Sequence, residues 1–242
     1  MSFDIPKSPS PYLPPARPSP DHRSRNVALA VVVSLVIVCG GLMVIAQFAN
    51  YDKIGPSDYP VRDFSTAMML LGIEPPRQWQ PFETHDFTIY LPGRFEPLST
   101  AEQPPAPDLH GGQVRLMARD TASLLFGTNI ILMSMAASSG VTPGKYVWNT
   151  AALMKKEGYQ IKDKSAYQLD GRAVGRLIYE TTTPGGQHAT GMQFVYVEDG
   201  TLWVIVGTVS NSDLDNWLPV IQEIARRFEV RPAGMEGFDI SV

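Results

Sequence analysis

The feature that most constrains this chain is an uncharged apolar run at residues 27–49, VALAVVVSLVIVCGGLMVIAQFA. At ~1.5 Å of rise per residue, a helix over this run is roughly 35 Å long, enough to cross the ~30 Å hydrocarbon core of a bilayer with slight tilt. A helix also satisfies its own backbone hydrogen bonds in lipid, which an isolated strand cannot do. The sequence therefore predicts a single transmembrane helix over residues 26–50, rather than a buried helix of a soluble domain.

A cleaved signal peptide is the main alternative for the same run. Val44, Ile45 and Ala46 could form a cleavage site, but the run is longer than the 7–15 apolar residues typical of signal peptides and follows a long tail. The single cysteine of the chain, Cys39, lies within the run, directly after Val38. Because a bacterial lipidation site requires a small residue before its cysteine, we interpret Cys39 as a membrane-buried thiol.

Charge is distributed unevenly about the apolar run. Of the formal net charge of −4, residues 1–25 contribute +2, so the residues after the run carry −6. Arg23 and Arg25 lie directly before the run, whereas Asp52 and Lys53 roughly cancel after it. Because Lys and Arg beside a span favour the cytoplasmic side, we expect a cytoplasmic N-terminus and an extracytoplasmic C-terminal domain. The acidic domain also argues against a nucleic-acid partner, whose phosphates attract basic surfaces.

The segments before and after the run differ in composition. Residues 1–25 hold seven prolines and five serines, so we expect a disordered Pro-rich tail, within which residues 14–18 could serve as a polyproline II ligand. Residues 51–81 form a connector, in which residues 63–71, DFSTAMMLL, are predicted to be a short apolar helix that ends before Gly72. This helix would either rest on lipid, contact a partner's membrane helix, or pack on the domain as a lid.

Residues 82–231 are predicted to form the globular domain, followed by a flexible C-terminus at residues 232–242. Asp170-Gly171 and Asp199-Gly200 indicate tight hairpins, and Pro184-Gly185-Gly186 indicates a looser turn. Runs of β-branched, aromatic and apolar residues between these turn signals indicate strands. The expected strands are 87–91, 114–119, 124–135, 160–169, 172–183, 188–198 and 201–209.

Two helices complete the domain. Thr142 is expected to cap the first, with Pro143 in its first turn, and Gly158 to end it. For the second, Ser212 and Asp215 suggest a capping box, and the proline at position 219 predicts a turn at 213–217 followed by a helix over 219–228. Two amphipathic helices and a sheet with two apolar faces predict an α+β fold, an antiparallel sheet with helices on both faces.

The segments FTIYLPGRF, YVWNTAALMKKEGYQI, QLDGRAVGRLIYET and MQFVYVEDGTLWVIVGTV, and the closing RRFEV, occur in this order between residues 82 and 231. In order and rhythm they resemble the PsbP-like superfamily, which includes bacterial envelope proteins of the DcrB and LpqN types. The resemblance implies a PsbP-like sandwich and a non-enzymatic role in binding or stabilising larger assemblies. No functional residue of that family matches a motif here, so the resemblance implies no site residues.

The sequence carries no motif for chemistry. It has no His-Glu-x-x-His, no Gly-x-Ser-x-Gly, no phosphate-binding glycine loop and no cysteine pair. The four histidines, His22, His85, His110 and His188, are isolated from one another, although His85 adjoins Asp86. We therefore predict no catalytic, cofactor-binding or metal-binding residues and no cofactor. We expect the Asp213/Asp215 pair to cap a helix rather than to act in acid–base chemistry. We expect the tryptophans Trp148, Trp203 and Trp217 to pack in the core rather than to line a ligand groove.

Two functions of different classes remain open. The first, which we favour, is a single-pass, membrane-anchored extracytoplasmic module of the cell envelope that binds another envelope or membrane protein without catalysis. The alternative is a small-ligand receptor or enzyme with a site between the sheet and the loop at residues 94–112, where His85, His110 or His188 would meet carboxylates.

Overall fold

The computed structural model describes residues 59, 61–98, 112–122, 128–182 and 187–231. The predicted tail at 1–25, the predicted transmembrane helix at 26–50 and the C-terminus at 232–242 lie outside these residues. None of the helices in the described ranges has the length and apolar character needed to cross a membrane.

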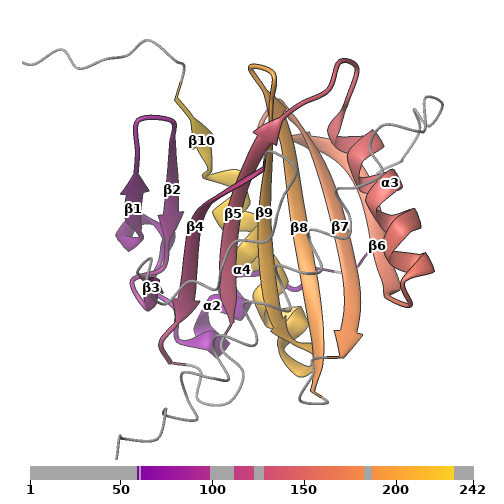
Figure 1. Cartoon of the computed structure of the whole chain (residues 1–242). Coiled ribbons are helices and arrows are strands. Elements are labelled where there is room, and N and C mark those ends of the chain that lie inside the picture. Colours follow the sequence, from indigo (N-terminus) through magenta and orange to yellow (C-terminus); the bar gives the residue numbers. More distant parts are fainter. Residues whose placement is uncertain (1–58, 60, 99–111, 123–127, 183–186, 232–242) are drawn as a thin grey trace, which may run out of the picture.

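The described chain forms two antiparallel sheets and three α-helices (Figure 1). The main sheet has seven strands in the order β3-β4-β5-β9-β8-β7-β6, and a smaller sheet has three in the order β1-β2-β10. The strands are β1 (Gln80–Glu83), β2 (Phe87–Leu91), β3 (Phe95–Pro97), β4 (Gln113–Asp120), β5 (Asn129–Ala136), β6 (Gln160–Leu169), β7 (Arg172–Thr182), β8 (His188–Glu198), β9 (Thr201–Ser210) and β10 (Glu229–Val230). The helices are α2 (Phe64–Leu71), α3 (Pro143–Lys156) and α4 (Leu214–Arg226), with short 3-10 turns η1 (Pro76–Gln78) and η2 (Asn211–Asp213).

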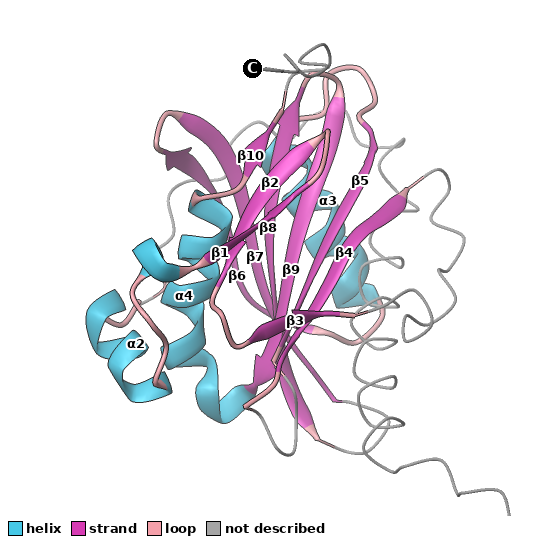
Figure 2. Ribbon diagram, turned by 90° about the vertical axis from the view of Figure 1, so that its left-hand side faces the viewer, coloured by secondary structure: helices cyan, strands magenta, loops and turns pink. Residues whose placement is uncertain are grey.

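Helices cover both faces of the main sheet, which confirms the predicted α+β architecture (Figure 2). On one face, α4 and the small sheet enclose a core that includes Phe194, Ile205 and Phe228. On the other face, α3 packs Val147 and Met154 against the strands. Because both faces of the central strands are covered, β9 is buried along most of its length, as its apolar sequence predicted.

Local sequence signals explain several of these elements. Asp170-Gly171 and Asp199-Gly200 adopt positive φ angles at both positions, as two-residue hairpin turns require. The Thr142 side chain accepts a hydrogen bond from the Lys145 backbone N–H and caps α3, as predicted. The predicted helix at 63–71 is α2, which begins after Asp63 and ends at Gly72 in the left-handed conformation.

The structure corrects the sequence prediction at helix α4. Residues 214–226 form one continuous helix with Pro219 inside it, not a turn followed by a helix from residue 219. Pro219 has no N–H to donate to the carbonyl of Asp215, and Asp215 is an exposed residue in the first turn of the helix. The predicted capping box is also absent, because Ser212 Oγ lies 2.9 Å from Ser210 Oγ and no side chain caps the helix.

Three strands were not predicted: β1, β3 and β10. The strand predicted at 87–91 belongs to the small sheet, because β10 pairs with one of its edges and β1 with the other. Strand β10 follows α4 directly, so the end of the described chain pairs with β2 near its start.

Candidate functional site

The turn between β1 and β2 carries a polar cluster built around His85, Asp86 and Arg115. We name the end of the domain that holds this turn and the Asp199-Gly200 turn the turn end, and the end that holds α2 and the start of α4 the α2 end (Figure 1). The two ends lie at opposite ends of the main sheet.

Thr84 shapes the β1–β2 turn. Its hydroxyl accepts hydrogen bonds from the backbone N–H groups of Asp86, at 3.3 Å, and Phe87, at 3.2 Å. The backbone N–H of Thr84 donates to the Phe87 carbonyl at 2.9 Å. A hydroxyl that bonds to the backbone two or three residues ahead favours a turn over continued strand. The turn therefore presents His85 outward and directs Asp86 toward β4.

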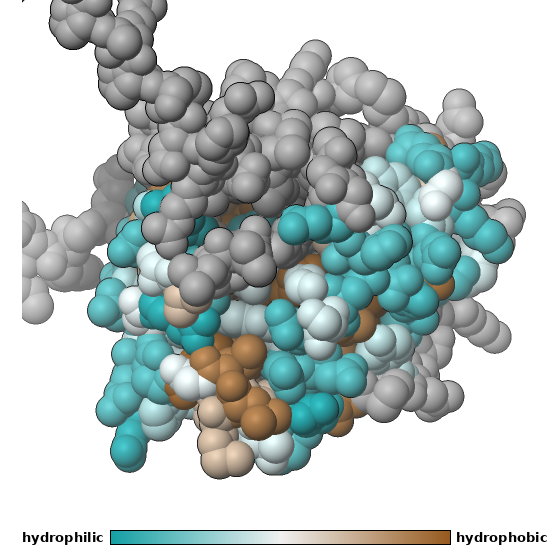
Figure 3. Space-filling view, turned by 90° about the horizontal axis from the view of Figure 1, so that it is seen from below, coloured by the Kyte–Doolittle hydropathy of each residue, from teal (hydrophilic) through white to brown (hydrophobic). Residues whose placement is uncertain are grey.

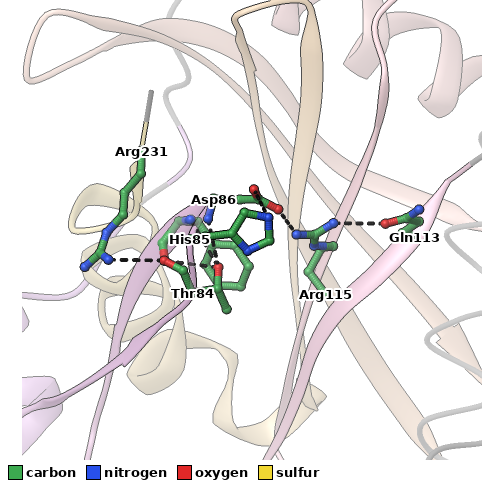
Figure 4. Close-up of polar contacts among 7 residues, drawn as sticks. Thr84, His85, Asp86, Gln113, Arg115 and Arg231 are labelled. Atoms are coloured by element: carbon green, nitrogen blue, oxygen red, sulfur yellow. Dashed lines mark hydrogen bonds and ion pairs between the residues drawn. The ribbon is translucent and has the colours of Figure 1, made fainter. Parts of the chain in front are cut away.

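Asp86 is the centre of the cluster (Figure 4). One carboxylate oxygen, Oδ1, lies 2.7 Å from His85 Nε2, and the other, Oδ2, accepts a hydrogen bond from Arg115 Nη2. Arg115 also donates to Gln113 Oε1 at 2.9 Å, and its guanidinium lies over the Phe87 ring, 6.0 Å from the ring centroid. The His85 side chain is 87% exposed, whereas that of Asp86 is 32% exposed and that of Arg115 is 21% exposed. The imidazole is thus the accessible group, and the ion pair beneath it supports it.

Arg231 ties β10 to the same turn. Its guanidinium donates to Thr88 Oγ1 at 3.1 Å and to the Thr84 carbonyl at 3.2 Å, and it pairs with Glu83 Oε2 at 2.7 Å. Its backbone N–H donates to the Asp86 carbonyl at 2.7 Å. The cluster therefore joins three segments that are distant in the sequence: the β1–β2 turn, the start of β4 and the end of β10.

The central polar groups of the cluster are satisfied within the cluster. Both carboxylate oxygens of Asp86 and the hydroxyl of Thr84 already have partners. Within the described residues, the side-chain partner of His85 is Asp86. In the same part of the chain, no group of three or more His, Cys, Asp or Glu residues is placed to hold a metal ion.

The structure separates the histidines that the sequence singled out. His85 contacts Asp86 at the turn end. His188 begins β8, where its Nδ1 lies 3.4 Å from Thr182 Oγ1, at the opposite end of that strand from the Asp199-Gly200 turn. His22 and His110 lie outside the described residues, as does most of the loop at 94–112. The described histidines therefore do not converge on a common site.

The tryptophans do not line a common groove either. Trp203 and Trp217 are buried in the core between the main sheet and α4, where Trp203 contacts Phe87 and Phe228. Trp148 lies on α3, across the sheet, with Lys164 Nζ 3.4 Å from its ring centroid. Asp213 and Asp215 flank the start of α4, and neither shares an ion pair with another described residue.

The sequence did not reveal Arg115 and Arg231 as part of this cluster. The only local signal was the adjacency of His85 and Asp86. Arg115 reaches the turn because β4 is placed there by pairing in the main sheet. Arg231 reaches it because β10 follows the end of α4 and pairs with β2. No local spacing in the sequence encodes either placement.

The chain was compared with known protein families, curated proteins and solved structures. No protein-family model matches the sequence, and no curated protein matches it. Among solved structures, the chain matches cyanobacterial PsbP (CyanoP) from Synechocystis sp. PCC 6803 with a TM-score of 0.46 and 14% identity, over 62% of this chain and 91% of that one. The chain resembles PsbP.

Two further solved structures are similar. LpqN of Mycobacterium tuberculosis, involved in cell envelope biogenesis, matches with a TM-score of 0.43 and 17% identity, over 72% of this chain and 99% of that one. PA94 of Pseudomonas aeruginosa, a protein of unknown function, matches with a TM-score of 0.44 and 14% identity, over 64% of this chain and 98% of that one. These are likenesses of overall arrangement, so the function has to come from the residues of this chain.

Proposed function

We propose that the chain is a single-pass, membrane-anchored module of the bacterial cell envelope that binds another envelope or membrane protein and carries out no catalysis. The anchor is the apolar run at 27–49, and the folded domain lies outside the cytoplasm. The partner-binding surface is the turn end, centred on His85 and supported by Asp86 and Arg115.

The observation that carries this proposal is the direction of the domain relative to the predicted anchor. The described chain enters at the α2 end, since Tyr59 and α2 precede all the strands, so a membrane anchor in residues 27–49 would lie on that side. The turn end lies at the far end of the main sheet and carries the exposed His85 (Figure 1). A binding surface at the end remote from the anchor is free to meet a partner that extends away from the membrane.

The composition of the cluster supports binding rather than catalysis. Arg115 is preorganised by two side-chain partners and a ring contact, and preorganised arginines lose less conformational freedom on binding. The exposed imidazole and the exposed Gln113 amide offer donors and acceptors at the rim. Such a mixed surface suits a partner with complementary polar groups more than a nucleic acid, because the residues after the apolar run carry a net charge of −6.

Purification of native complexes tests the proposal. The full chain, tagged after Val242 and gently solubilised, is expected to co-purify with a specific membrane or envelope protein. A double variant, His85→Ala with Gln113→Ala, removes the exposed groups but leaves the Asp86–Arg115 pair, and is expected to lose that protein at unchanged thermal stability. Recovery of the wild-type chain alone would contradict the proposal.

A matched control separates recognition from general surface effects. His188→Ala with Gln160→Ala removes the same two side-chain types from exposed positions at the α2 end of β8 and β6. This variant is expected to retain the partner. If both variants lose the partner equally, or if both retain it, the turn end does not determine binding.

A further inference from the structure

Helix α2 has one face packed on the domain and another that remains in solvent. Ala67 is fully buried, and Phe64, Met68 and Leu71 pack against the core that lies beneath α4. On the other face, Met69 is 75% exposed. Its neighbour Leu70 is 55% exposed. The helix therefore does not bury all of its large apolar side chains.

These side chains are unusual in the described part of the molecule because they are large, hydrophobic and exposed. Together with Val61, which is 43% exposed, Met69 and Leu70 are the large hydrophobic residues found exposed there. Viewed from below, the domain shows a compact hydrophobic group bordered by hydrophilic residues (Figure 3). Scattered single exposed apolar residues are normal on soluble proteins, but adjacent ones on one short helix indicate a contact surface. We call Val61, Met69 and Leu70 the α2 patch.

The orientation of α2 is fixed, so the α2 patch cannot rotate into the core. At its start, the Asp63 carboxylate accepts a hydrogen bond from the Thr66 backbone N–H at 2.9 Å. At its end, Gly72 reverses the chain in the left-handed conformation, and Arg94 donates to the Leu71 carbonyl. With both ends held and Ala67 against the domain, Met69 and Leu70 are presented outward.

The sequence before α2 limits what can cover the patch. The last residue of the apolar run, Ala49, precedes Phe64 by 15 positions. A chain of that length spans at most about 50 Å when extended, and roughly 20 Å on average when flexible. If residues 27–49 cross a bilayer, α2 is thus held close to that bilayer at a high effective concentration.

We propose that the α2 patch inserts at the surface of the bilayer that holds the anchor, with Met69 and Leu70 at the boundary between headgroups and acyl chains. This inference rests on the proposed function, because it requires the membrane anchor. The contact seats the α2 end on lipid and orients the turn end, with His85, away from the membrane. Apolar side chains gain free energy when they leave water for the apolar boundary of a bilayer, and the tether allows so small a patch to be effective.

A bilayer fits the α2 patch better than a second copy of the chain. Stable protein interfaces bury roughly 800 Å² on each partner, with some 20–30 residues a side. The patch offers three large apolar side chains on and next to one helix of eight residues. Lipid needs no complementary shape, so a few apolar side chains near an existing anchor are sufficient.

Depth-resolved fluorescence of the full chain in phospholipid nanodiscs tests the inference. In a Cys39→Ser background, a fluorophore on Ser65→Cys reports from the exposed turn of α2 that precedes Met69, and leaves the α2 patch intact. A fluorophore on Gln168→Cys, exposed next to the Asp170-Gly171 turn, serves as the control. The position-65 probe is expected to be quenched several-fold more by brominated lipid than the position-168 probe, and several-fold less by aqueous iodide.

The outcomes separate the inference from the proposed function. If the chain does not co-elute with nanodiscs, the anchor is absent, and both the proposed function and the lipid contact are wrong. If it co-elutes but the position-65 probe is as accessible to iodide as the position-168 probe, only the lipid contact is wrong. Shielding from iodide without quenching by brominated lipid would also overturn the contact, in favour of a protein neighbour such as a second copy.

A second variant links the result to the side chains themselves. Met69→Ser with Leu70→Ser removes the exposed apolar groups but not the buried Ala67, so the domain is expected to remain folded. Lipid quenching of the position-65 probe is expected to fall to the level of the position-168 control. Unchanged quenching in this variant would show that the α2 patch does not make the contact.

Discussion

Arg94 and Asp120 form a bidentate ion pair, in which Arg94 Nε and Nη2 each lie 2.6 Å from a different oxygen of the Asp120 carboxylate. The Asp120 side chain is 1% exposed and that of Arg94 is 19% exposed. The same guanidinium donates to the Leu71 carbonyl at the end of α2 and lies over the Trp217 ring of α4, 5.6 Å from its centroid. One arginine thus connects the end of β4 with α2 and α4, and so fixes the helix that carries the α2 patch.

Removal of one partner from this pair is expected to be costly. Asp120→Ala leaves a half-buried guanidinium without its counter-charge, and breaking such a pair costs about 3–5 kcal/mol of unfolding free energy. Chemical denaturation of the full chain in detergent, followed by tryptophan fluorescence, measures the loss.

The exposed pair between Glu83 and Arg231 provides the control for Asp120→Ala. Its side chains are 50% and 41% exposed, so Glu83→Ala is expected to cost less than about 1 kcal/mol. Equal losses in the two variants would mean that burial of the Arg94–Asp120 pair does not determine its contribution.

Any side chain at Gly191 in β8 is expected to destabilise the fold. A Cβ at this position would lie 2.2 Å from Tyr179 Cζ in the adjacent strand, and the Tyr179 ring is fully buried, so it cannot move aside freely. We expect Gly191→Ala to lower the unfolding free energy by about 1–3 kcal/mol. Combining it with Tyr179→Val should cost less than the sum of the two single variants, and strict additivity would contradict the steric account.

Buried phenols are expected to make the domain sensitive to alkali. Burial raises the pKa of Tyr179 and Tyr196 above the ordinary value of 10.0. A group whose folded-state pKa is raised contributes stability that is intact below the unfolded-state value and is lost as pH rises toward the folded-state value. Each phenol should therefore reduce the unfolding free energy by about 1.4 kcal/mol per pH unit above about pH 10.

Denaturation midpoints at a series of alkaline pH values check this expectation. Tyr179→Phe should show a shallower loss of stability above pH 10 than the wild type, because one of the buried titrating phenols is gone. Tyr179 is the better choice, since the Tyr196 hydroxyl donates to the Ala225 carbonyl at 2.6 Å and its removal would have a second effect. Identical pH slopes for the two proteins would contradict the assignment.

The start of α2 is expected to loosen in acid. Hydrogen bonds from Thr66 lower the pKa of Asp63 below its ordinary value of 3.8. The capping contribution is therefore present above that ordinary value and is lost as pH falls through the lowered value. The mobility of a spin label on Ser65→Cys should increase in this acid range. Asp63→Asn, which keeps a capping side chain, should remove the pH dependence, whereas Asp63→Ala should be mobile at every pH.

Much of the fold was accessible from the sequence because its signals are local. The Asp-Gly hairpins, the Thr142 cap and the 63–71 helix each depend on residues within a few positions of one another. Strands β3 and β10 lack such a signal, because they span three and two residues and form only by pairing with β4 and β2. Sheet edges of this kind depend on tertiary contacts.

The polar contacts that define the candidate site and hold α2 were harder to predict from the sequence. The partners of Asp86 include its neighbour His85, which the sequence offered, and Arg115, which lies 29 positions away. Arg94 meets Asp120 across 26 positions. No periodic pattern in the sequence predicts which residue an arginine side chain will contact. Only the folded arrangement identifies these contacts.

Protease accessibility in intact cells, with a different tag at each end of the full chain, is the most direct test of the proposed membrane orientation. If the domain is extracytoplasmic, external protease is expected to remove the C-terminal tag and digest the domain, while the N-terminal tag remains protected. Protection of the domain with loss of the N-terminal tag would reverse the orientation, and protection of both ends would contradict a membrane-anchored extracytoplasmic module.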